Sequence, residues 1–150
     1  MNSTKKLESY MRLAVAEAEK ALLENEVPVG AVVVLDGEVI SSAHNMSIGL
    51  HDMTAHAELL AMQQAAKQLN GRLDQCVLFV TLEPCAMCAG AAMNLRLNRI
   101  VFGAYDEVNG CCGSKADLTD HWFGHSIETI GGILEDECSS ILSSFFQKKR

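Results

Sequence analysis

Apolar residues follow two different periods along the chain, and these periods predict its first elements. Between residues 7 and 25 the apolar side chains stand three or four positions apart, as in a helix with one buried face. Pro28 ends this segment, because proline disfavours helix in the residue before it. Residues 29–35 are apolar throughout, which is typical of a strand buried on both faces. Residues 36–37, Asp-Gly, form a two-residue hairpin turn, so residues 38–43 should return antiparallel.

The rest of the chain alternates helical patterns with short apolar runs. Helices are expected at residues 55–69, 85–95 and 134–149, and strands at residues 76–81, 99–103 and 127–130. Strands that alternate with helices favour a layered fold. We therefore predict an α/β protein with a three-layer α/β/α fold, in which helices cover a central mixed sheet of about five strands. No linker or repeat divides residues 1–150, which we interpret as a single domain.

Composition excludes some classes of protein. No run of about 18 uncharged apolar residues is present, so we expect no membrane-spanning segment and no membrane partner. The first residues lack the apolar stretch of a signal peptide, which makes the cytoplasm the expected location. The net charge of −7 argues against broad, non-specific binding of nucleic acid, because that binding depends on clustered cations. The negative net charge does not exclude a local basic patch, and residues 147–150 are the one dense run of basic residues in the sequence.

Two short motifs supply a set of metal ligands. His56 and Glu58 stand at the start of one expected helix, and Cys85 and Cys88 stand three residues apart at the start of another. Zinc prefers thiolate and imidazole ligands, and a catalytic zinc keeps three of them so that water can take the fourth position. We therefore predict that His56, Cys85 and Cys88 bind Zn²⁺. Glu58 is then expected to lie beside the metal as a base.

The local sequence explains how these ligands can converge. Residues three apart share a helix face, so Cys85 and Cys88 can bind one ion. Pro84 suits a helix start, and the positive end of the helix dipole favours thiolate. Thr54 is the expected N-cap of the first metal helix. A lone C-x-x-C is also typical of a redox pair or of half a structural zinc site, but the combination H-A-E…P-C-x-x-C is the zinc-deaminase signature.

The four other cysteines are interpreted as reduced thiols. Cys76 and Cys138 lie in apolar patterns and are expected in the core. Cys111 and Cys112 are adjacent in a glycine-rich loop, where a bond between neighbours would be strained. A second metal site at this pair is an alternative.

Longer stretches around these motifs resemble one family. The chain is similar to the bacterial tRNA adenosine deaminases, of the cytidine-deaminase-like superfamily, in E-V-P-V-G-A-V-V-V at residues 26–34 and T-L-E-P-C-A-M-C-A-G-A at residues 81–91. The resemblance implies the cytidine-deaminase-like fold and a homodimer with one zinc per subunit. It implies hydrolytic deamination of the wobble adenosine of a tRNA anticodon stem-loop to inosine, with no DNA partner expected.

The residues present suffice for the hydrolytic deamination that the resemblance implies. Zinc lowers the pKa of bound water from 15.7 to about 7, and the resulting hydroxide attacks C6 of the purine. Glu58 accepts the water proton and then delivers protons to the ring and to the departing ammonia. The backbone N–H of Cys85, at a helix start, is expected to stabilise the developing negative oxygen.

The resemblance also implies a set of substrate contacts: Asn45, Val29, Ala57, Asp106, Phe146 and Lys149. The side-chain amide of Asn45 can hydrogen-bond to the edge of a purine. The alternative is that Asn45 has only a structural role, as a residue of a turn. Asp106 can accept a hydrogen bond from a ribose 2′-OH, or it can cap its own loop. Of Phe145 and Phe146, one is expected in the core and one near the RNA. Val108 stands where the family often has lysine, a departure that bears on RNA affinity and not on the zinc chemistry.

Two other functions fit parts of this pattern. A deaminase of a free base or nucleoside, such as guanine or cytosine, would use the same zinc site and would need no basic tail. A non-catalytic, zinc-stabilised module that only binds RNA or a partner would need the three ligands alone. Glu58 argues against this module, because a structural site has no use for an unliganded carboxylate beside the metal.

Overall fold

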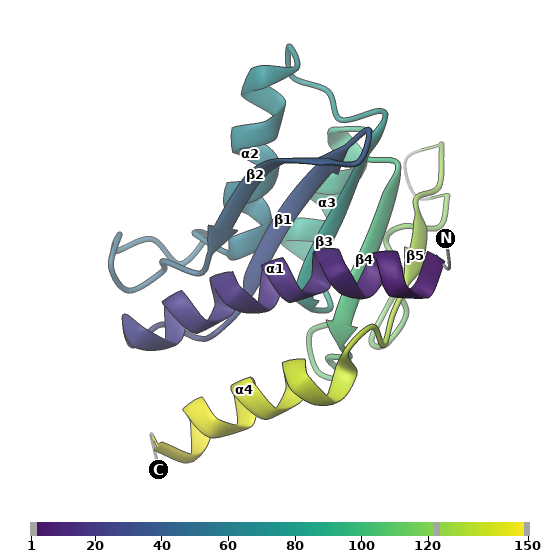
Figure 1. Cartoon of the computed structure of the whole chain (residues 1–150). Helices are drawn as coiled ribbons and strands as arrows, with labels where there is room; N and C mark the ends of the chain where they lie inside the picture. Colours follow the sequence, from purple (N-terminus) through teal and green to yellow (C-terminus); the bar gives the residue numbers. More distant parts are fainter. Residues whose placement is uncertain (1–2, 122–123, 149–150) are drawn as a thin grey trace.

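A mixed five-stranded sheet forms the centre of the protein in a computed structural model, which describes residues 3–121 and 124–148 (Figure 1). The strand order is β2-β1-β3-β4-β5. The strands are β1 (Gly30–Leu35), β2 (Glu38–His44), β3 (Cys76–Leu82), β4 (Arg99–Ala104) and β5 (Glu128–Ile130). The helices are α1 (Ser3–Leu23), α2 (Ala57–Gln68), α3 (Ala86–Asn94) and α4 (Glu135–Lys148).

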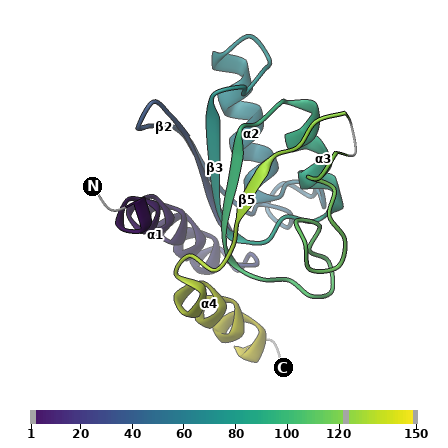
Figure 2. The same ribbon diagram turned by 90° about the vertical axis from the view of Figure 1, so that its right-hand side faces the viewer.

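Helices cover both faces of the sheet, so the predicted three-layer α/β/α fold is confirmed. Helices α1 and α4 lie on one face, and α2 and α3 lie on the other (Figure 2). Strand β1 explains why its sequence is apolar at every position. Val32 and Val34 pack with Met11 of α1, whereas Ala31 and Val33 belong to the core beneath α2 and α3. Each face of β1 is thus buried.

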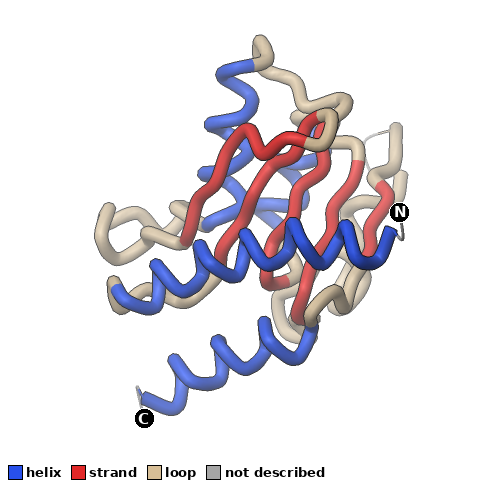
Figure 3. The backbone as a smooth tube through the Cα atoms, viewed as in Figure 1, coloured by secondary structure: helices blue, strands red, loops and turns tan. Residues whose placement is uncertain are grey.

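Strand directions bring several loops to one end of the sheet. Strand β1 runs antiparallel to β2 and β3, and β4 and β5 run parallel to β3. The start of β1 therefore lies at the same end of the sheet as the ends of β2, β3 and β4, and the loops at residues 45–56 and 105–114 both leave the sheet at this end (Figure 3). Both helices of the metal motifs also begin at this end. Helix starts beside strand ends are where α/β folds commonly bind ligands.

Glycine is required where α1 crosses the first residue of β1. A Cβ atom on Gly30 would lie 2.0 Å from the carbonyl oxygen of Ala14 and 2.5 Å from the nitrogen of Ala18. Because glycine has no side chain, the backbone of α1 can pack directly against the strand at this residue. In the described part of the chain, no helix combines the length and apolarity that crossing a membrane requires.

His44, the last residue of β2, lies between two glutamates. Its Nδ1 is 3.0 Å from Oε1 of Glu17, and its Nε2 is 3.1 Å from Oε1 of Glu24. Burial disfavours the charged ring, but the two carboxylates outweigh burial and raise the pKa of His44. For Glu17, burial is outweighed by hydrogen bonds from Lys20 and His44, which lower its pKa. The cluster joins α1 to the end of β2, next to the loop at residues 45–56.

We expect this cluster to make stability depend on pH. The contribution of His44 to the free energy of unfolding is fully present below its unfolded pKa of 6.5 and is lost as pH rises through the higher folded pKa. The free energy of unfolding, measured by urea denaturation, should therefore be higher in wild type than in His44→Gln, and this difference should be larger at about pH 6 than at about pH 9. The change should stay below about 1 kcal/mol, because solvent screens the partly exposed cluster. Equal differences at both pH values, or a similar change in the exposed-loop control His51→Asn, would contradict this expectation.

Candidate active site

The metal motifs lie at the N-terminal ends of α2 and α3. His56 is the N-cap of α2 and Cys85 is the N-cap of α3, each with extended backbone angles. Cys88 follows inside α3 and is buried. The expectation that Thr54 caps α2 is wrong. The helix begins only at Ala57, so Thr54 belongs to the preceding loop, where its hydroxyl donates to Oδ1 of Asp52 at 2.6 Å.

The three predicted ligands converge on one point. The distance from Nδ1 of His56 is 3.6 Å to Sγ of Cys85 and 3.7 Å to Sγ of Cys88. All three ligand atoms lie within 4.8 Å of one another. Tetrahedral zinc, with Zn–S of about 2.3 Å and Zn–N of about 2.0 Å, separates sulfur from nitrogen by about 3.6 Å. The donor set and its spacing therefore fit zinc.

Among the described residues, this is the one cluster of three or more histidine, cysteine or acidic ligands close enough to hold a metal. Cys111 and Cys112 are buried free thiols outside it, so the alternative of a second metal site at this pair is not supported. Cys76 and Cys138 are buried free thiols in the two halves of the core, as expected.

The contact between the two ligand thiols shifts their pKa values in opposite directions. Hydrogen bonding from Cys88, together with His56, lowers the pKa of Cys85 to about 3. The pKa of Cys88 is raised, first because its thiol donates to Cys85 and then because it is buried. The hydrogen bond to Cys85 likewise raises the pKa of His56. Zinc binds both sulfurs as thiolates, so metal binding releases the protons that these thiols carry.

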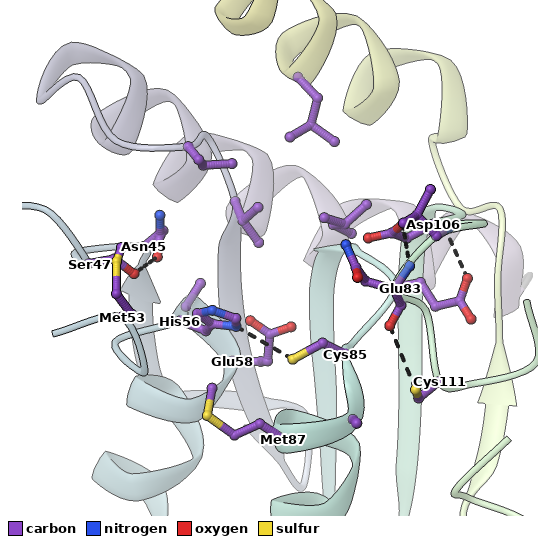
Figure 4. Close-up of a pocket in the computed structure, with 18 of the residues that line it drawn as sticks. Asn45, Ser47, Met53, His56, Glu58, Glu83, Cys85, Met87, Asp106 and Cys111 are labelled. Atoms are coloured by element: carbon purple, nitrogen blue, oxygen red, sulfur yellow. Dashed lines mark hydrogen bonds between the residues drawn. The ribbon is translucent and has the colours of Figure 1, made fainter. Parts of the chain in front are cut away.

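Glu58 lies beside the ligands without joining their cluster (Figure 4). Its side chain is 4% exposed, and burial raises its pKa to about 7. The charge of His56 opposes this rise. A carboxyl group with a pKa near neutrality can both accept and return a proton at physiological pH. This arrangement, with three ligands and one adjacent acid, matches what a hydrolytic metal site requires.

A cavity of about 1080 Å³ opens over the metal cluster and Glu58. The loops at residues 45–53 and 105–115 form its two sides, and α4 borders it. The structure places on its lining five of the six predicted substrate contacts: Val29, Asn45, Ala57, Asp106 and Phe146. The sixth, Lys149, lies outside the described residues. The cavity is large enough for more than a single base, because pockets for drug-sized ligands span about 300–1,000 Å³.

Asn45 is held firmly on one side of the cavity. It is 7% exposed, and its N–H donates to the carbonyl oxygen of Val29 at 3.1 Å, which continues the β1–β2 ladder. Its side-chain oxygen accepts from the hydroxyl of Ser47 at 2.9 Å (Figure 4). These contacts fix the orientation of its amide at the cavity wall.

Asp106 stands on the opposite side and caps its own loop. Its Oδ1 accepts from the N–H groups of Val108 at 3.1 Å and Asn109 at 3.0 Å. The capping alternative is therefore realised, in a residue that also lines the cavity. At the C-terminal helix, Phe145 is 7% exposed and Phe146 is 48% exposed. Phe145 packs inside, as expected, and Phe146 borders the cavity, while its place near the RNA stays a prediction.

Two buried glutamates at the cavity were not predicted to have a role. Glu26 and Glu83 are each 2% exposed, and both accept hydrogen bonds from backbone N–H groups of the cavity loops. For Glu83 a signal was present in the sequence, because this acid ends the largely apolar stretch of residues 76–82 and directly precedes Pro84, whereas Glu26 follows the polar residues Glu24 and Asn25. A charge in such a stretch requires buried partners, but the pattern alone does not say which loop supplies them.

Comparison with known proteins extends this geometry to a family. Residues 4–104 match the model of the cytidine and deoxycytidylate deaminase zinc-binding region. The tRNA-specific adenosine deaminase of Bacillus subtilis (strain 168) is 46% identical over 145 residues, which cover 95% of this chain and 90% of that protein. This chain belongs to the tRNA-specific adenosine deaminase family. The zinc cofactor and the family resemblance predicted from the sequence are thereby confirmed.

Solved structures agree with membership of the tRNA-specific adenosine deaminase family. One chain comes from a study of A-to-I editing by tRNA:A34 deaminases at the wobble position of transfer RNA. It has a TM-score of 0.83 and 38% identity, covering 89% of this chain and 99% of that one. The guanine deaminase of Bacillus subtilis has a TM-score of 0.62 and 36% identity, over 65% of this chain and 64% of that one. The free-base alternative is thus the less supported of the two.

Proposed function

We propose that this protein hydrolytically deaminates adenosine to inosine at the wobble position of a tRNA anticodon. One observation carries the proposal: a zinc-ligand cluster with a buried glutamate beside it, in a chain 46% identical to a tRNA-specific adenosine deaminase. The substrate is expected to be an anticodon stem-loop, because the wobble base there is unpaired and can enter a pocket.

His56, Cys85 and Cys88 would hold the zinc. When bound, zinc is a Lewis acid that lowers the pKa of a coordinated water from 15.7 to about 7. Glu58 then accepts the water proton and carries protons to the purine ring and to the leaving ammonia. The N–H of Cys85 lies at the start of α3, where helix N–H groups favour a developing negative charge.

The cavity lining accounts for the recognition of adenosine. The amide of Asn45 is oriented by Ser47 and hydrogen-bonds an edge of the base. Val29 and Ala57 are apolar and buried, and they contact its ring. Asp106 keeps Oδ2 for a ribose 2′-OH, since the loop N–H groups bond to Oδ1. Phe146 offers a ring on which a neighbouring base can stack, and we assign Lys149 to a phosphate contact.

We further propose a single-domain protein that acts as a homodimer in the cytoplasm, with one zinc per subunit. All described elements pack on one sheet, which supports a single domain. The homodimer is supported by three exposed apolar side chains in the loop next to the cavity: Ile48, Leu50 and Met53. Exposed apolar patches of this kind are typical of surfaces that a partner chain covers. A tRNA substrate is consistent with the cytoplasm. Sedimentation velocity would measure the mass of the assembly.

Deamination of a free base is the second candidate, because the guanine deaminase of Bacillus subtilis shares this fold and 36% identity. The decisive assay incubates the zinc-loaded protein with an anticodon stem-loop that carries a wobble adenosine. Free adenosine, guanine and cytidine are run in parallel, and inosine and ammonia are measured. Inosine in the stem-loop, with the small substrates unchanged, is the expected result. Ammonia from a free base, with the stem-loop unchanged, would overturn the proposal.

A further inference from the structure

Glu83 is a buried carboxylate that holds the loop of residues 105–114 against the rest of the site. It follows the last residue of β3 and stands two residues before the zinc ligand Cys85. Its Oε1 accepts from the N–H of Asp106 at 3.0 Å and from the hydroxyl of Ser114 at 2.5 Å. Its Oε2 accepts from the N–H groups of Cys112 at 3.1 Å and Ser114 at 3.0 Å. The same loop therefore supplies four donors to one carboxylate.

The loop is wrapped closely around this carboxylate. The N–H of Gly110 donates to the carbonyl oxygen of Asp106 at 2.8 Å, which closes a turn over Glu83. A Cβ atom on Gly110 would lie 2.4 Å from the carboxyl carbon of Glu83. In addition, the N–H of Cys111 donates to the carbonyl oxygen of Pro84 at 2.8 Å. The loop thus follows the segment at residues 83–84 without space for another atom.

The location of Glu83 relates this loop to the metal. Glu83 belongs to the short segment that delivers Cys85 to the zinc cluster, whereas Asp106 and Cys111 belong to the cavity wall facing Asn45 (Figure 4). A buried carboxylate is costly unless its lone pairs are filled, and here the loop fills them. Disorder in the loop would leave this charge without partners, so the ordered loop is favoured.

We propose that Glu83 is a positioning residue, which fixes the wall carrying Asp106 at a set place relative to the zinc ligands. It does not touch the reacting atoms and acts through the loop. For the identity of the substrate, this inference rests on the function proposed above. Its effect should appear in substrate binding. If the ordered loop is the binding-competent form, the apparent affinity falls in proportion to the fraction of molecules that hold it.

The Glu83→Gln variant tests this inference with a nearly isosteric change. A carboxylate offers two acceptor oxygens, but an amide offers one oxygen and one NH₂ donor. Whichever way the amide turns, its NH₂ group faces at least one backbone N–H of the loop. We expect KM for the stem-loop to rise about tenfold, which corresponds to an ordered fraction of about one tenth. The zinc content should remain at the wild-type value, and kcat should change by less than about threefold.

Hydrogen–deuterium exchange measures the loop without any substrate. Exchange of the amides at residues 106–114 should quicken in Glu83→Gln and stay at the wild-type rate in the control Glu38→Gln. The control removes the same charge from an exposed residue beside the Asp36–Gly37 turn, at the opposite end of the sheet. Gly110→Ala provides a second route, because it keeps Glu83 and displaces the loop sterically. It should raise KM in the same direction.

The outcomes separate the two proposals. Unchanged loop exchange in both Glu83→Gln and Gly110→Ala would overturn the positioning role, and so would faster exchange with KM unchanged. A fall in kcat with KM unchanged would also overturn it, because it would place Glu83 in the chemical step. A wild-type protein that leaves the stem-loop unmodified would overturn the proposed function instead. Loop exchange would then still decide whether Glu83 fixes the loop.

Discussion

The Glu58→Gln variant should lower kcat by about 100- to 10,000-fold, the usual range for removal of a general acid–base group. Glutamine has nearly the shape of glutamate, so it can fill the same buried space at 4% exposure. It cannot accept the water proton or return it to the substrate. Zinc should be retained, because Glu58 lies outside the ligand cluster. Single-turnover inosine formation, with zinc measured on the same sample, would check this expectation.

Two comparisons make this result specific. Glu58→Asp keeps an acid one methylene farther from the substrate and should retain more activity than Glu58→Gln. Glu38→Gln removes a charge from an exposed position and should leave kcat at the wild-type value. Wild-type turnover in a zinc-loaded Glu58→Gln protein would show that another group moves the proton.

The Cys88→Ala variant should lose zinc, activity and part of its stability together. Removal of one of three protein ligands opens the site, and the free energy of metal binding no longer supports the folded state. For a chain of this size the melting temperature should fall by about 2–4 °C for each kcal/mol lost. Zinc per chain by mass spectrometry and the midpoint of thermal unfolding are the two measurements.

Chelation of the wild-type protein should approach the same state, and added zinc should reverse it. Cys112→Ala is the matched control, because Cys112 is a buried thiol in the described chain but stands outside the ligand cluster. It should bind zinc at the wild-type ratio. A full complement of zinc in Cys88→Ala, or its loss in Cys112→Ala, would mean that the ligands were assigned incorrectly.

Most of the fold could be predicted from the apolar pattern. The unbroken apolar run that became β1 signalled burial on both faces, and the Asp36–Gly37 pair signalled its hairpin with β2. The ligands His56, Cys85 and Cys88 could be predicted because zinc has narrow preferences for donor atoms and spacing. Here the chemistry of single residues was sufficient.

Other features depend on contacts between distant parts of the chain. The N-cap is His56 in place of Thr54 because Thr54 is part of the preceding loop, where its N–H and hydroxyl both donate to Asp52. The donors of Glu83 come from a loop more than twenty residues later, which no short sequence window contains. Helix α1 begins at Ser3, before its apolar period starts at residue 7, because polar first turns continue a helix without a buried face.

The two sides of the cavity differ in how their backbones are supported. Asn45 continues the hydrogen-bond ladder of β1 and β2, so its place is inherited from the sheet. Asp106 belongs to a loop outside the sheet, which is held by four hydrogen bonds to the carboxylate of Glu83 and by backbone bonds such as that from Cys111 to Pro84. Replacement of residues 105–114 by a loop that keeps these donors to Glu83 should therefore leave the sheet and the zinc ligands intact. Under the proposed function, protein engineering would alter the substrate contacts through that single loop and leave the wall at Asn45 unchanged.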